Sequence, residues 1–121
     1  MVTLKSNNEP YWICGALIFS GRQDPTWLLN EDEAQKILGI WNSLPESAGQ
    51  LSVPNILGYK GCFLSSNTNT KWASFRGIVT LYKDNSPVES RTDTERKFEK
   101  AIISTAPEDA IPRAMLIEEF E

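Results

Sequence analysis

Apolar residues follow two spacings along this chain, and each spacing predicts a type of secondary structure. In residues 11–20 nearly every position is apolar, which predicts a strand that is covered on both faces. Between Asn30 and Pro45 the apolar positions recur every three or four residues, which predicts an amphipathic helix with one buried stripe. Asn30 and Glu33 form a capping box that would begin this helix, and Pro45 would end it.

Two later apolar runs predict a pair of strands. Residues 57–66 and 71–83 are apolar or alternate in polarity, and the turn-forming residues 65–71 separate them, which indicates an antiparallel hairpin. Residues 84–91 are polar and include Pro87, so we interpret them as a loop.

The last third of the chain predicts two helices. A second capping box at residues 92–95 would open a helix that ends before Pro107, and a short apolar segment after Pro112 predicts a final helix. The order is therefore strand, helix, strand, strand, helix, helix. We predict a single α+β domain over residues 1–121, with helices packed on a mainly antiparallel three-stranded sheet.

Composition and charge narrow the functions that we expect. The 121 residues fit one domain, and the net charge of −4 argues against nucleic acid or an anionic membrane surface as the partner. The polar first ten residues contain no signal-like apolar segment, so we expect a cytoplasmic protein. The chain has no histidine, which removes the commonest general base, and we predict that the protein is not an enzyme.

The two cysteines lie in apolar segments without a CxxC spacing. Cys14 and Cys62 both fall within predicted strands. We therefore predict two buried free thiols, in preference to a disulfide, and no zinc site.

An oxygen-rich segment precedes the first predicted helix. Asp24, Asn30, Glu31, Asp32 and Glu33 provide the carboxylate and amide oxygens that calcium prefers, although their spacing is not that of an EF-hand. An alternative interpretation is purely structural, because carboxylates in the first turn of a helix are stabilised by its dipole and its free N–H groups.

Three further oxygen ligands lie between residues 84 and 93. Asp84, Glu89 and Asp93 could also coordinate a cation, or they could simply be turn and helix-start residues. Arg22, close to Asp24, suggests a third possibility, in which a carboxylate base works beside an arginine that binds an anion. Its alternative is a local ion pair that shapes the loop.

The run FSGRQDPTW, the capped helix after it and the later LGYKG resemble a small bacterial family of domains. In overall build the chain is also similar to the small acidic calcium-binding proteins of filamentous cyanobacteria, which store calcium in the cytoplasm during heterocyst differentiation. This second resemblance implies an α+β fold outside the EF-hand class, with calcium bound by oxygen ligands on loops. It identifies no individual ligand.

Three hypotheses for function follow. The first is a cytoplasmic calcium buffer or sensor that binds Ca²⁺ through the two oxygen-rich segments. The second is a protein-interaction or regulatory module that needs no ligand and acts on a protein partner. The third is a histidine-free enzyme centred on Arg22 and Asp24.

Overall fold

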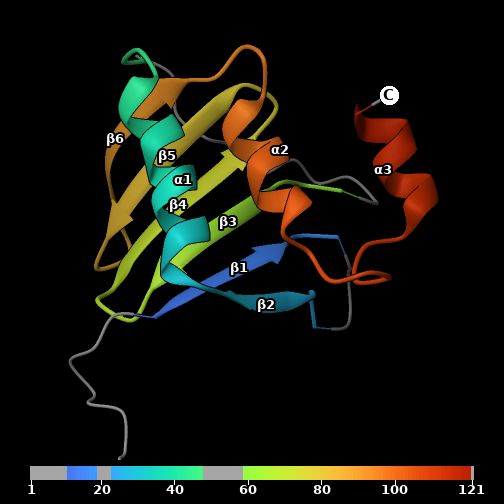
Figure 1. Ribbon diagram of the computed structural model, residues 1–121. Helices are drawn as coiled ribbons and strands as arrows, with labels where there is room; N and C mark the ends of the chain where they lie inside the picture. Colours follow the sequence, from blue (N-terminus) through green and yellow to red (C-terminus); the bar gives the residue numbers. More distant parts are fainter. Residues whose placement is uncertain (1–10, 19–22, 48–58, 121) are drawn as a thin grey trace, which may run out of the picture.

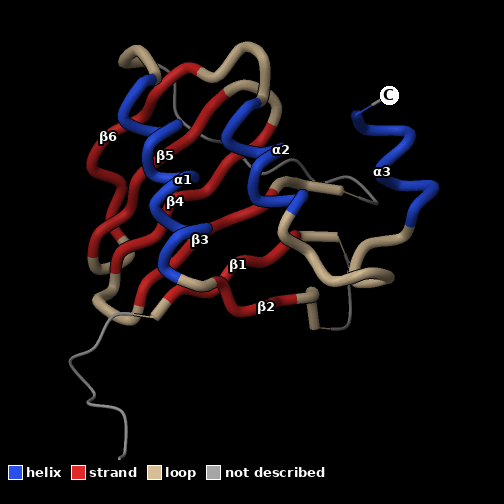
Figure 2. Tube along the Cα trace, viewed as in Figure 1, coloured by secondary structure: helices blue, strands red, loops and turns tan. Residues whose placement is uncertain are grey.

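The computed structural model describes residues 11–18, 23–47 and 59–120, and within them six strands form one antiparallel sheet (Figure 1). The strand order across the sheet is β2-β1-β3-β4-β5-β6. Helices α1 and α2 lie side by side on one face, whereas α3 lies at the end of the sheet (Figure 2). The elements are β1 (Trp12–Ala16), β2 (Thr26–Leu29), α1 (Glu31–Ser43), β3 (Cys62–Ser66), β4 (Thr70–Phe75), β5 (Ile78–Lys83), β6 (Ser86–Thr92), α2 (Lys97–Ser104) and α3 (Arg113–Phe120).

The prediction of a three-stranded sheet is wrong, although the α+β class is confirmed. Residues 71–83, predicted as one strand, fold back at Arg76 and Gly77 into β4 and β5, and Phe75 pairs with Ile78. Both turn residues have positive φ angles, of 43° and 100°, which is the left-handed region that tight hairpin turns require. An apolar alternation that continues through the turn conceals this reversal in the sequence.

Two other strands lie where loops were predicted. Residues 84–91 contribute β6, which pairs with β5 after a turn at Asp84 and Asn85. The edge position of β6 tolerates Pro87, because the outer side of an edge strand needs no N–H donor. Strand β2 lies inside the loop that was expected to hold calcium, with Trp27 and Leu29 buried.

Helix α1 confirms the predicted boundaries. The Asn30 side chain accepts from the Glu33 N–H, the Glu33 side chain accepts from the Asn30 N–H, and the helix ends two residues before Pro45. The final helix is also confirmed, as α3. The capping box predicted at residues 92–95 is wrong, because α2 begins at Lys97 after Arg96, whose φ is 58°.

The core lies between the sheet and helices α1 and α2. Trp12, Trp27 and Trp41 are buried there with Phe98. Cys14 and Cys62 are both free and buried, which confirms that prediction. Among the described helices, none is both long and apolar enough to cross a membrane.

Candidate functional site

The acidic residues before and within α1 serve the fold around them. Glu31 accepts hydrogen bonds from Trp12 Nε1 and from Gln35, each at 2.8 Å, and the first of these bonds lowers the pKa of Glu31 below its usual value. Asp24 accepts from the Ile18 N–H at 2.8 Å. Asp32 is exposed on the first turn of α1. Asn30 and Glu33 form the capping box that begins α1, so both side chains have a structural role at the start of this helix.

The second group of expected ligands is spread over three places. Asp84 lies in the β5–β6 turn, and Glu89 pairs with Arg91 on β6. Asp93 is buried, and its two carboxylate oxygens accept from the N–H groups of Lys97 and Phe98 at 2.9 and 2.8 Å. It therefore caps α2 from four residues before that helix begins.

The structure does not bring the expected ligands together. Within residues 11–18, 23–47 and 59–120 there is no group of three or more Asp, Glu, Cys or His side chains that could hold a metal ion. Arg22, the predicted anion-binding residue, lies outside the described residues, as do residues 19–20 and 57–58 at the ends of two predicted strands. Calcium binding stays a prediction.

A separate cluster of ion pairs and hydrogen bonds surrounds the buried carboxylate of Glu99 on α2. The Glu99 side chain is 0% exposed. Its carboxylate accepts from Arg96 Nε and Nη2, each at 2.8 Å, from the Arg76 N–H at 3.1 Å and from the Tyr59 hydroxyl. Four donors thus fix one buried carboxylate, which meets the requirement that a buried charge be paired and hydrogen-bonded.

Helix α3 completes this cluster through its last turn. Arg76 Nε and Nη2 donate to the two carboxylate oxygens of Glu119 at 2.7 and 2.8 Å. Arg96 Nη2 lies 2.9 Å from the same carboxylate, and Arg96 Nη1 donates to the Glu119 carbonyl at 3.1 Å. The ring of Phe120 lies 4.4 Å from the Arg96 guanidinium carbon and packs edge-on against Tyr59. Two guanidinium groups therefore converge on one acidic side chain.

Electrostatics in this cluster follow from burial and from the ion pairs. The hydrogen bond from Arg76 lowers the pKa of Glu119, and the hydrogen bond to Glu99 raises the pKa of Arg96. Burial raises the pKa values of Tyr59 and Cys62, and the nearby Glu99 charge raises both further. At neutral pH the tyrosine and the thiol are thus neutral, and the two arginines are the cations of the cluster.

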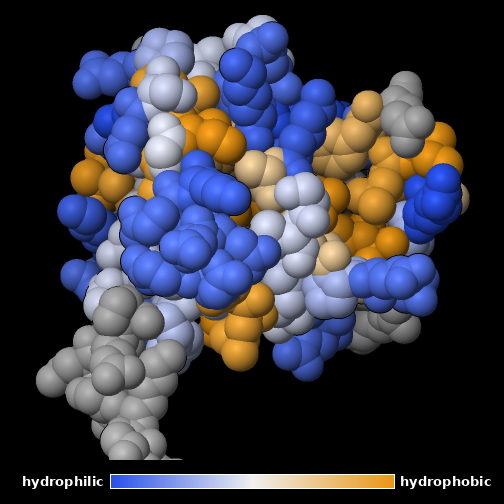
Figure 3. All heavy atoms as spheres, viewed as in Figure 1, coloured by the Kyte–Doolittle hydropathy of each residue, from blue (hydrophilic) through white to orange (hydrophobic). Residues whose placement is uncertain are grey.

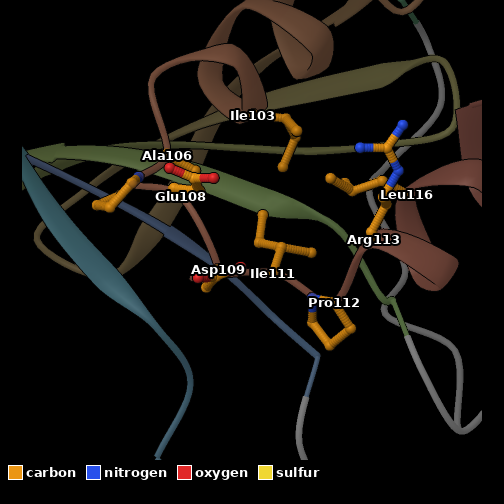
Figure 4. Close-up of a pocket in the computed structure, with 9 residues that line it drawn as sticks. Ile103, Ala106, Glu108, Asp109, Ile111, Pro112, Arg113 and Leu116 are labelled. Atoms are coloured by element: carbon orange, nitrogen blue, oxygen red, sulfur yellow. The ribbon is translucent and has the colours of Figure 1, made fainter.

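A cavity of about 340 Å³ lies between the end of α2 and the start of α3. Ile103, Ile111 and Leu116 point toward its centre, and Glu108 and Arg113 contribute to its rim (Figure 4). The visible surface over α3 and this corner is rich in apolar residues (Figure 3). The cavity thus borders the start of α3, where Met115 and Leu116 pack against the core while only partly buried.

Sequence reasoning missed Tyr59, Arg76, Arg96, Glu99 and Glu119. One signal was present, because Arg96 and Glu99 are three residues apart at the start of a predicted helix, a spacing at which opposite charges can pair. Nothing local connects this pair with Tyr59 or Glu119, which approach it only in the folded chain. Comparison of the chain with protein-family models, with curated proteins and with solved structures finds no match.

Proposed function

We propose that this chain is a protein-interaction module that binds an acidic segment of a partner protein through the guanidinium groups of Arg76 and Arg96. The observation that supports this proposal most is their convergence on the single carboxylate of Glu119. A two-pronged contact between a guanidinium and a carboxylate combines charge with fixed geometry, and proteins use it repeatedly to recognise acidic groups.

Glu99 supports recognition by holding Arg96 in place. It binds the Nε side of the guanidinium with two hydrogen bonds, so that the remaining N–H groups are directed at Glu119. A buried ion pair of this kind adds little net stability compared with apolar residues of similar size. Its clearest effect here is orientation, because the direction of the Arg96 N–H groups is fixed before any acidic group arrives.

The surroundings of Arg76 suit a docking surface. Its side chain is 54% exposed, and its guanidinium lies 4.8 Å from the centre of the Phe75 ring. Protein interfaces are enriched in arginine and aromatic residues, and these residues carry much of the binding energy. A partner can therefore reach Arg76 from solvent, whereas Arg96 lies deeper.

Selection of peptides on the immobilised full-length chain tests this proposal. We expect the selected peptides to be acidic, and we expect Arg76→Glu to weaken their binding at least about tenfold, because a rim cation becomes a repulsive charge. Lys83→Glu is the matched control, since it changes the net charge equally at the exposed far end of β5. Equal binding by both variants, or selection of peptides without acidic residues, would contradict the proposal.

A further inference from the structure

Helix α3 makes its side-chain ion pairs at its last turn, and its apolar packing is partial. Within α3, all of which the structure describes, no residue is buried, and Ile117 is 45% exposed. Met115 and Leu116 pack against the core while only partly buried, and a cavity borders Leu116. Its polar attachment consists of the Glu119 contacts with Arg76 and Arg96, and Phe120 packs against Arg96 beside them.

The last-turn contacts involve two adjacent residues of α3. A carboxylate occupies the two guanidinium groups, and the next residue places an aromatic ring on the face of one of them. Arg96 also binds the Glu119 carbonyl, which is free because it lies in the last turn. A helix that carries glutamate followed directly by an aromatic residue in its last turn presents the same groups. Ring and cation attract each other beyond their simple contact area.

We propose that α3 is an exchangeable internal occupant of the Arg76–Arg96 site, and that the partner segment is a helix carrying glutamate followed by an aromatic residue. This inference rests on the proposed function, and it specifies the ligand of the same site. Charge complementarity with the two arginines and the ring position of Phe120 select this ligand over other acidic segments.

An exchangeable α3 competes with the partner helix for the same two arginines. A partner helix reaches the arginines only in the fraction of molecules from which α3 has withdrawn, so the apparent dissociation constant is the intrinsic one divided by that fraction. A change that weakens α3 docking without altering the arginines must therefore tighten binding of the partner helix. This dependence distinguishes an exchangeable helix from one that is merely structural.

The test uses a fluorescent peptide with the sequence of residues 113–121 and the full-length protein, and it follows fluorescence anisotropy. We expect Glu119→Gln to bind the peptide at least about tenfold more tightly than the unchanged chain, because its own α3 competes less well. Phe120→Ala, which removes the ring but keeps the carboxylate, should act in the same direction. Neither substitution alters the pair formed by Glu99 and Arg96, and thermal unfolding is measured to check that both variants are folded.

The matched control is the same peptide with glutamine at the position of Glu119, which should lose binding to every form of the protein. Equal affinity of the unchanged chain and both variants, equal binding of the control peptide, or no binding at all would overturn the inference. The proposed function and this inference fail separately. Acidic peptides without an adjacent aromatic residue that still depend on Arg76 would leave the proposed function intact and overturn the ligand inferred here. Peptides whose binding does not depend on Arg76 would overturn the proposed function itself.

Discussion

The first turn of α1 and the first turn of α2 both carry glutamate, but the two helices use it in opposite ways. At α1 the side chains of Glu31 and Glu33 lie near solvent and satisfy N–H groups of Trp12 and Asn30. At α2 the side chain of Glu99 is fully buried and fixes the orientation of Arg96. The comparison shows that the exposed glutamates of α1 each accept one or two hydrogen bonds near their helix start, whereas the buried Glu99 joins Tyr59, Arg76 and Arg96 in one cluster.

The largest expected effect is the loss of the buried carboxylate. Glu99→Ala should lower the free energy of unfolding by about 3 kcal/mol or more, because the Tyr59 hydroxyl, the Arg76 N–H and the Nε of the largely buried Arg96 all lose their acceptor. Urea unfolding followed by tryptophan fluorescence measures this change. A double variant, Arg96→Met with Glu99→Leu, should recover part of the lost free energy of unfolding. If Glu99→Ala alone cost less than about 1 kcal/mol, the Glu99 carboxylate would not organise this cluster.

Removing the cap of α1 should cost less than removing Glu99. Asn30→Ala should lower the free energy of unfolding by about 1 kcal/mol, since the Glu33 N–H loses its acceptor. Asp32→Ala, in the same exposed turn, is the control and should cost about 0.3 kcal/mol through the helix dipole alone. If Asn30→Ala proved as costly as Glu99→Ala in the same urea experiment, the contrast between the two helix starts would disappear.

Acidification should release α3 before it unfolds the sheet. The pKa of Glu119 is lowered below its ordinary value of 4.5 by the hydrogen bonds from Arg76. The pair therefore stabilises α3 above pH 4.5 and loses this contribution as the pH falls through the lowered pKa. Amide hydrogen exchange of α3 between pH 6 and pH 3 reports the release, and this pH dependence should be much weaker in Glu119→Gln.

The smallest expected effect is the response of the α1 acids to calcium. Glu31 already accepts from Trp12 and Gln35, and Asn30 and Glu33 bind each other, so we expect calcium to leave these contacts unchanged. Calorimetric titration with Ca²⁺, with tryptophan emission followed in parallel, measures this directly. Binding at micromolar concentration that is abolished by Asp24→Asn or Asp32→Asn would support the calcium site predicted from the sequence.

The sequence predicted α1 well because its signals are local. The reciprocal cap links residues three apart, and Ala34, Ile37 and Trp41 recur with helical spacing on the buried face. The start of α2 was misjudged because Asp93 reaches past Arg96 to cap the helix from outside, and a residue with a positive φ angle lies between them. The capping-box pattern spans four residues, so it does not describe a cap that lies four residues before the helix.

The missed strands and the missed site have a common physical cause. Strand β6, which the structure describes throughout, has no buried residue and β2 is only four residues long, so their place in the sheet depends on their neighbours rather than on their own apolar pattern. Glu99 likewise has an ordinary position on its helix. It becomes the centre of a cluster only because it binds Tyr59, 40 residues away, and Arg76, 23 residues away. Local patterns predict elements with strong periodicity, and contacts between distant segments decide the rest.

The strand order has a consequence for how the chain folds. Consecutive strands pair in β1–β2, β3–β4, β4–β5 and β5–β6, whereas the β1–β3 pairing joins segments as distant as Trp12 and Ser66. Nearby segments meet faster than distant ones because less chain must be closed into a loop. During synthesis the β1–β2 hairpin and α1 therefore emerge first but wait for β3 before the sheet can close. We expect the contacts of Glu99 and Glu119 to form after those of the sheet, because α2 and α3 follow all six strands in the chain.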